Sequence, residues 1–188
     1  PHVPASRITE LPQEQAPFAI ILGCSDSRVP AELVFDQGIG DLFVIRVAGN
    51  IVAPSQVGSV EFAAECFETR LVVVLGHSRC SAVEATLDHI QGTGQVSSRN
   101  LGSIVSRLRP PLEALVRTEL RHDRDALLHE AVRANVRASV DHLRHGSELL
   151  ERLIQGQGVH VVGAEYSITT GVVDFFELGA LECEPART

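Results

Sequence analysis

The sequence predicts an α/β fold: one domain with a parallel sheet, an antiparallel edge strand and helices on both faces. Two observations carry this prediction, namely short runs that are apolar throughout and intervening segments with helical periodicity. Strands covered on both faces are continuously apolar, and alternation of strands with helices produces right-handed parallel crossovers. The 188 residues, 44% hydrophobic and 21% charged, suit a single domain over residues 1–188.

The first half of the chain contains three of these apolar runs, at residues 18–23, 42–47 and 71–76. Segments 55–70 and 80–90 place apolar residues at steps of three and four, which is the spacing of an amphipathic helix. The predicted order is strand, helix, strand, helix, strand, helix, which means parallel βαβ units with right-handed crossovers. We expect the three strands to lie parallel in one sheet.

The second half contains helical segments before it returns to strands. Pro110 and Pro111 are expected to divide two helices, because proline lacks the N–H group that a helix interior needs. Residues 128–143 repeat apolar side chains at helical steps and predict a long amphipathic helix. Gly146 and Ser147 then predict the end of that helix and the N-cap of the next.

The last two apolar runs, at residues 159–163 and 172–176, predict a fourth parallel strand and a fifth strand. Thr170 and Gly171 between them are typical of a turn, so the fifth strand should close an antiparallel hairpin. Two of the four cysteines, Cys66 and Cys183, are expected to be small core residues.

The charge and hydropathy of the chain exclude two classes of partner. A formal net charge of −8 disfavours nucleic acids and anionic membranes, which bind basic faces. The longest apolar runs are about five residues, whereas a membrane-spanning helix needs about 20. We expect a cytoplasmic protein with neither nucleic acid nor membrane as partner. The sequence begins at Pro1 rather than at a methionine, so the removal of a targeting segment is not excluded.

Chemically reactive groups follow two of the predicted strands at the point where each strand ends. Cys24 comes directly after the first strand, and His77 and Cys80 come at the end of the third. Neighbouring strands lie about 4.8 Å apart, so these side chains should converge. Two thiolates and one imidazole suit Zn²⁺, with a fourth position left for water. His77 taken alone would more often be a structural residue, but the three together predict a zinc site.

Asp26 and Arg28 alternate with Cys24 and should share its side of the chain. One interpretation is a surface salt bridge, worth roughly 0–1 kcal/mol. The other is that Arg28 holds the carboxylate ionised and away from the metal, so that Asp26 orients a metal-bound water. The second interpretation predicts a catalytic zinc site rather than a structural one.

The stretches CSDSR at residues 24–28 and HSRC at residues 77–80 together resemble the β-class carbonic anhydrases. The likeness continues through residues 34–50, 59–65 and 163–175, and it covers nearly the whole chain except an N-terminal helix that we expect to be missing from this sequence. The resemblance implies a homodimer or higher homo-oligomer. It also implies reversible hydration of CO₂ to bicarbonate and a proton by zinc-bound hydroxide.

The resemblance also implies the roles of single residues. Cys24, His77 and Cys80 match the zinc ligands, and Asp26 and Arg28 match the dyad beside the zinc-bound water. One subgroup of the family binds regulatory bicarbonate in a pocket with a tryptophan three residues before the first ligand. Ile21 stands at that position here. We therefore expect an open, water-bound zinc near neutral pH rather than one closed by Asp26.

The resemblance places four residues in the substrate pocket. Gln15 matches a glutamine that reaches substrate across a dimer interface, and Phe43 matches an apolar pocket residue. Phe62 stands where many members have tyrosine. Family members usually have a small or acidic residue in place of Arg79, and glycine in place of Ser81. We expect these two differences to affect substrate access and rate.

Two other functions stay open on the sequence alone. A hydrolase of carbonyl sulfide or carbon disulfide would use the same zinc site, since these molecules are linear electrophiles like CO₂. A non-catalytic zinc-binding homologue would keep the fold but would have no use for Asp26 and Arg28.

Overall fold

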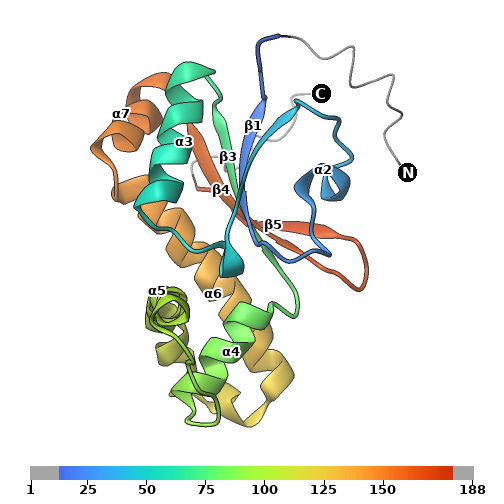
Figure 1. The fold of residues 1–188 in the computed structure, drawn as a ribbon, viewed down its shortest axis with the longest axis vertical. Helices are drawn as coiled ribbons and strands as arrows, with labels where there is room; N and C mark the ends of the chain where they lie inside the picture. The colour runs from blue at the N-terminus through green and yellow to red at the C-terminus, as the bar shows by residue number, and fades with distance from the viewer. Residues whose placement is uncertain (1–12, 180–188) are drawn as a thin grey trace, which may run out of the picture.

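The computed structural model describes residues 13–179 and contains one sheet with the strand order β2-β1-β3-β4-β5 (Figure 1). The first four strands in this order are parallel, and the last is antiparallel to its neighbour. The strands are β1 (Ala19–Gly23), β2 (Leu42–Arg46), β3 (Leu71–His77), β4 (His160–Tyr166) and β5 (Val173–Glu177). The predicted parallel sheet with an antiparallel edge strand is confirmed.

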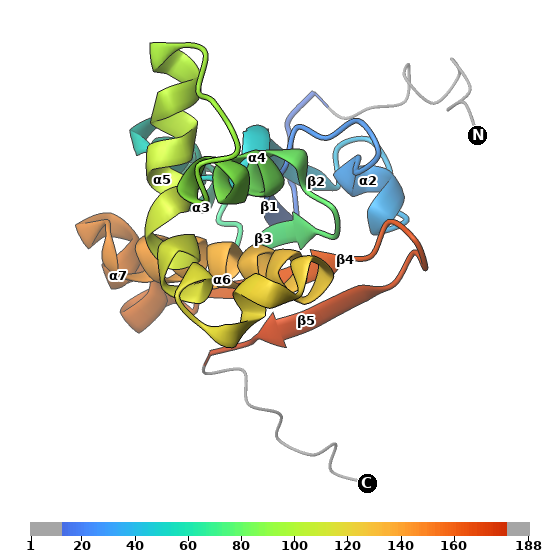
Figure 2. The ribbon, with the colours of Figure 1, turned by 90° about the horizontal axis from the view of Figure 1, so that it is seen from below.

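The helices cover the two faces of the sheet unequally. They are α2 (Ala31–Val34), α3 (Pro54–Cys66), α4 (Ser81–Ile90), α5 (Arg99–Val116), α6 (Arg124–His145) and α7 (Glu148–Gln157), with 3-10 turns η1 (Ala48–Asn50) and η2 (Glu119–His122). Helices α3, α6 and α7 pack on one face, and the short α2 on the other (Figure 1). Helices α4, α5 and α6 form a further apolar cluster together (Figure 2). None of the helices within residues 13–179 could span a bilayer, because none combines sufficient length with sufficient hydropathy.

The central strand β1 is buried on both faces, which explains its continuously apolar sequence. Ile20 and Leu22 point into the core under α3, α6 and α7, whereas Ile21 points into the core on the α2 side. All three side chains are at most 1% exposed. At about 25 cal/mol for each Å² of buried apolar surface, such burial stabilises the strand far more than β-propensity alone.

The prediction that Pro110 and Pro111 divide two helices is wrong, because α5 runs through both prolines. The helix loses hydrogen bonds to the carbonyl groups of Ser106 and Arg107, four residues earlier, but both of these residues are exposed, so water can reach those groups. The opposite face of α5 buries leucines on either side of the prolines completely. The burial of this face offsets the two lost hydrogen bonds.

The predicted junction between α6 and α7 is confirmed. Gly146 follows the last residue of α6, and its N–H donates to His142 O at 2.8 Å. Ser147 is the N-cap of α7, since its Oγ accepts the N–H of Leu150 at 3.2 Å. The cap satisfies one of the N–H groups that the first helical turn leaves free.

The expectation that Cys66 is a core residue is wrong. It is the last residue of α3, and its side chain is exposed. Ala63 and Ala64 are the buried residues of that turn, whereas Cys66 lies at the end of the helix. Cys183 lies outside the described residues.

Two glycines allow α6 to lie close to the sheet. A Cβ atom on Gly76 in β3 would lie 2.6 Å from Val136 Cγ2, and one on Gly163 in β4 would lie 2.8 Å from Val136 Cγ1. Carbon atoms do not approach so closely without displacing one another. Both glycines are therefore needed for the contact between α6 and the sheet that positions the strand ends.

We expect Gly76→Ala to lower the free energy of unfolding by about 1–3 kcal/mol, because the new methyl group overpacks the core against Val136. Urea unfolding of the metal-free protein measures this loss. Val136→Ala in the same chain should leave the double variant less destabilised than the sum of the two single changes. Gly58→Ala on α3 is the control, because its new Cβ atom would meet nothing within 4 Å. This variant should raise the free energy of unfolding slightly, since alanine favours a helix more than glycine does. Equal effects of the two glycine substitutions would contradict the packing argument.

Candidate metal centre

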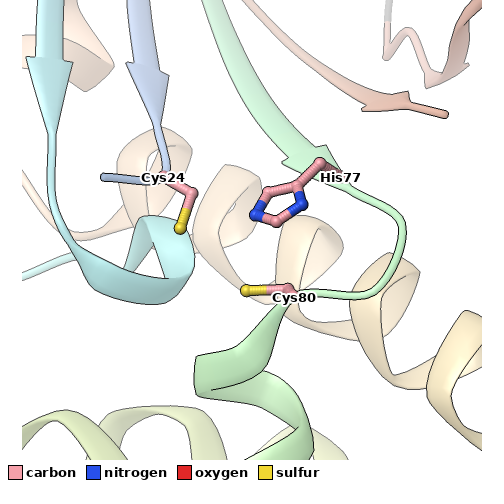
Figure 3. A group of neighbouring side chains, drawn as sticks. All are labelled: Cys24, His77 and Cys80. Atoms are coloured by element: carbon pink, nitrogen blue, oxygen red, sulfur yellow. The ribbon is translucent and has the colours of Figure 1, made fainter. Parts of the chain in front are cut away.

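The sheet brings Cys24, His77 and Cys80 together at the carboxyl ends of its strands. Cys24 follows β1, His77 ends β3, and Cys80 directly precedes α4. Because β1 and β3 are paired neighbours, the first two residues meet at the same edge. The ligand atoms of all three lie within 4.8 Å of one another, and the residues are 5%, 0% and 2% exposed, respectively. Figure 3 shows the two sulfur atoms and the imidazole ring facing a common space.

The imidazole of His77 is oriented as a metal ligand. Its Nδ1 donates a hydrogen bond to the backbone oxygen of Ser78 at 3.0 Å, which leaves the lone pair on Nε2. Among the described residues, buried Nε2 has no hydrogen-bond partner. An unsatisfied buried polar atom costs about 1–3 kcal/mol, so a cation bound to Nε2 would remove a real penalty. This orphaned atom is evidence that the residues fit a metal.

The pKa values of the Cys24 and Cys80 thiols change in opposite directions. A hydrogen bond from Cys80 lowers the pKa of Cys24 well below that of an ordinary thiol, although burial opposes the change. The same hydrogen bond, together with burial, raises the pKa of Cys80. The hydrogen bond therefore favours the thiolate form of Cys24, which metal binding requires. Two sulfurs and one imidazole match the preferences of Zn²⁺ better than those of Mg²⁺ or Ca²⁺.

The carboxylate of Asp26 is held beside this cluster by Arg28. The Arg28 Nε and Nη2 atoms donate to the two carboxylate oxygens at 2.9 and 2.6 Å, and the Arg28 backbone N–H donates at 2.9 Å. The Asp26 Oδ2 atom lies 3.8 Å from His77 Nε2. Hydrogen bonding to Arg28 holds the pKa of Asp26 far below its usual range, so the carboxylate stays ionised. An ionised acceptor therefore lies next to the candidate metal ligands.

Arg46 is a residue of the centre that the sequence analysis missed. Its Nε donates to Cys24 O at 3.0 Å, and its Nη2 donates to Asp26 O at 2.6 Å. Arg46 ends β2, and its Cα pairs with that of Gly23 in β1. The contact joins a side chain to backbone oxygens 20 and 22 residues away, so only the pairing of β1 with β2 could have revealed it.

The four predicted pocket residues do not lie together in this chain. Ser81 begins α4 directly after Cys80 and is exposed near the cluster. Phe43 in β2 pairs with Ile20 in β1, and Ile20 comes four residues before Cys24. At roughly 3.3 Å per residue, Phe43 therefore lies about 13 Å from Cys24 along the sheet. The Phe62 ring lies 6.4 Å from that of Phe43 and is half exposed. Gln15 lines a separate hollow of about 970 Å³.

The loop between His77 and Cys80 contains a residue with a strained backbone. Arg79 has a backbone φ of 55°, in the left-handed region that favours glycine. This conformation accompanies a hydrogen bond from Arg28 Nη2 to Arg79 O at 3.3 Å. Arg28 therefore connects the Asp26 side of the centre to the loop from His77 to Cys80.

We expect Arg79→Gly to raise the free energy of unfolding by about 1 kcal/mol, because glycine adopts this φ without steric cost. Urea unfolding of the metal-free protein measures the gain. The bond from Arg28 should survive, since its acceptor is a backbone oxygen. Arg107→Gly is the control: this residue lies in the interior of α5, where glycine should destabilise by about 1 kcal/mol. A loss of stability in Arg79→Gly would contradict the assignment of strain.

Comparison with protein families identifies what this arrangement is similar to. The profile of the family described as "Carbonic anhydrase" matches residues 19–173, a range that contains the whole cluster. Carbonic anhydrase 2 of Mycobacterium tuberculosis is 36% identical over 159 residues, which cover 84% of this chain and 73% of that protein. A carbonic anhydrase of Mycolicibacterium smegmatis is 45% identical over 106 residues, covering 56% of this chain. The match spans about half, 51%, of the M. smegmatis protein.

Solved structures share the fold. The β-carbonic anhydrase CafA of Aspergillus fumigatus superposes with a TM-score of 0.80 at 27% identity, covering 95% of this chain and 83% of that chain. A β-carbonic anhydrase of Sordaria macrospora, described as tetrameric, has a TM-score of 0.77 at 24% identity and covers 90% of this chain and 83% of that chain. The second likeness concerns the fold alone.

Proposed function

This chain belongs to the β-class carbonic anhydrase family, and we propose that it catalyses the reversible hydration of CO₂ to bicarbonate and a proton. One observation carries the proposal: Cys24, His77 and Cys80 form a buried cluster of three ligands beside an ionised carboxylate. Structural zinc sites use four protein ligands, whereas catalytic sites use three and leave one position for water. The carboxylate has no evident use in a purely structural site.

The residues have separate tasks in the proposed reaction. Cys24 Sγ, Cys80 Sγ and His77 Nε2 would hold Zn²⁺, which lowers the pKa of a bound water towards 7 and so supplies a hydroxide nucleophile. Asp26 would accept a hydrogen bond from the attacking water and thereby direct its lone pair at CO₂. Arg28 keeps Asp26 ionised and engages both carboxylate oxygens, which disfavours direct binding of Asp26 to the metal. Anions that cannot donate a hydrogen bond to Asp26 would bind poorly.

We further propose that a second copy of the chain completes the substrate pocket, as a homodimer or a larger homo-oligomer. Gln15, Phe43 and Phe62 lie away from the cluster of their own chain, so a neighbouring chain would have to bring them to it. Large apolar side chains are exposed on the same molecule, including Phe18 at 55%, Phe62 at 51% and Ile39 at 49%. Association with a second copy of the chain would cover such side chains. Sedimentation of the purified protein tests this proposal, and a monomer at all concentrations would contradict it.

The proposed reaction is tested by zinc quantification combined with stopped-flow CO₂ hydration. We expect one zinc ion per chain and hydration that becomes faster as the pH rises through neutrality. Release of sulfide from carbonyl sulfide is the comparison. Zinc-loaded protein that releases sulfide but does not hydrate CO₂ would support the hydrolase alternative, and protein with neither activity would support a non-catalytic role.

A further inference from the structure

Helix α6 is connected to the metal centre through the turn η1. Asn135 Nδ2 donates to Gly49 O at 2.8 Å, and Ser139 Oγ donates to Asn50 O at 3.2 Å. The N–H of Gly49 in turn donates to Cys24 Sγ at 3.3 Å. In Figure 3 this turn lies directly beside the sulfur of Cys24. Hydrogen bonds therefore run from the middle of α6 to one ligand of the cluster.

The two polar side chains that begin this connection are unusual for their position. Asn135 is 3% exposed and Ser139 is 4% exposed, and both lie on the face of α6 that otherwise buries apolar residues such as Val132 and Val136. Burying an amide or hydroxyl is unfavourable unless it is hydrogen-bonded. The turn η1 supplies those bonds. A backbone oxygen accepts and never donates, so the Asn135 amide must direct its NH₂ group at Gly49.

The turn itself is strained and closely packed. Gly49 has a φ of 68° and Asn50 a φ of 42°, both in the left-handed region. A Cβ atom on Gly49 would lie 3.1 Å from Leu108 Cδ1 in α5 and 3.2 Å from Ala82 Cβ in α4. A left-handed residue other than glycine costs roughly 1–2 kcal/mol, so Asn50 needs external support. The hydrogen bonds from α6 provide that support where the turn meets Cys24.

We infer that Asn135 is a positioning residue of the metal centre, with Ser139 assisting it. By holding η1, Asn135 keeps the Gly49 N–H on Cys24 Sγ, which fixes the direction of this sulfur and withdraws part of its charge from the metal. Residues that support metal ligands in this way typically change metal affinity 10- to 100-fold. The inference rests on the proposed zinc centre, but it does not depend on the proposed reaction.

The test measures metal binding rather than catalysis. Asn135→Asp keeps the size of the side chain but replaces the donor by a carboxylate facing Gly49 O, and Asn135→Leu removes polarity altogether. Zinc affinity is measured by competition with a chromophoric chelator, and thiolate coordination by the sulfur-to-metal charge-transfer absorption of the Co²⁺-loaded protein. We expect both variants to bind zinc about 10- to 100-fold more weakly and to shift this absorption. Ser139→Ala should act in the same direction with a smaller effect.

Thr86→Val is the matched control. Thr86 is completely buried in α4, and its Oγ1 donates within that helix, to Ala82 O at 2.8 Å, rather than to η1. This variant should lose stability but keep wild-type zinc affinity and Co²⁺ absorption.

The inference is overturned if the Asn135 variants behave like Thr86→Val, losing stability alone. If neither Asn135 variant folds, Ser139→Ala decides, and wild-type affinity and absorption in that variant would overturn the inference. Wild-type protein that fails to bind zinc would overturn the proposed centre as well, so the two failures are distinguishable.

Discussion

His77→Ala is expected to lose stoichiometric zinc and to reduce CO₂ hydration to the uncatalysed rate. His77 supplies one of three ligand atoms from a completely buried position, and within residues 13–179 no other histidine lies in the cluster. Without the imidazole only two protein ligands remain, whereas protein zinc sites use three or four, so the two thiols alone form a poor site for a divalent ion. Metal analysis after dialysis and stopped-flow hydration measure both losses.

The control for this variant is His145→Ala. His145 is an exposed histidine whose Nδ1 contacts only Asp141 on its own helix, so zinc content and hydration should be unchanged. Removal of zinc from wild type by a chelator should also abolish hydration, and Zn²⁺ but not Mg²⁺ should restore it, because thiolate ligands select against Mg²⁺. A His77→Ala protein that retains zinc and rate would refute the assignment of the ligands.

Asp26→Asn is expected to keep zinc while lowering kcat for CO₂ hydration about 100- to 1000-fold, the usual loss when a catalytic hydrogen-bonding partner is removed. The amide has one oxygen, and the donors of Arg28 compete for it. The NH₂ group is then the end presented to the metal centre, so the variant cannot accept a hydrogen bond from the attacking water. Metal analysis and stopped-flow kinetics separate zinc binding from rate.

Glu113→Gln is a matched control for the loss of a paired carboxylate. Glu113 pairs with Arg109 in α5 and with Arg117 directly after it, and its side chain is partly exposed, so its substitution should leave kcat unchanged. Full activity of Asp26→Asn would show that Asp26 does not orient the water.

The pH dependence of the wild-type rate should not come from Asp26. Hydrogen bonding to Arg28 holds the pKa of Asp26 below its usual range, so Asp26 is ionised throughout the neutral range. Because the folded-state pKa is the lower one, the stabilisation from this carboxylate is fully present above the unfolded value of about 3.9 and is lost as the pH falls through the folded value. Acid unfolding of Asp26→Asn should therefore be less steep than that of wild type.

Errors and omissions in the sequence analysis share a physical origin. Pro110 and Pro111 predicted a helix break from local backbone chemistry, but α5 continues because Leu108 and Leu112 on its opposite face are completely buried against the neighbouring helices. Arg46 and Asn135 were missed because each acts on backbone oxygens far away in the sequence. A side chain that binds backbone needs no particular partner residue, so it leaves no paired pattern in the sequence.

The sequence by itself determined the sheet and the cluster of ligands. Continuous apolar runs specify strands that are buried on both faces, and parallel strands carry whatever follows them to one edge, so Cys24, His77 and Cys80 could be brought together by reasoning alone. Only the tertiary structure decided how these ligands are held. The hydrogen bond from Arg46 depends on the pairing of β1 with β2, and the bond from Asn135 depends on the packing of α6 against η1. Both contacts form only when the whole chain packs.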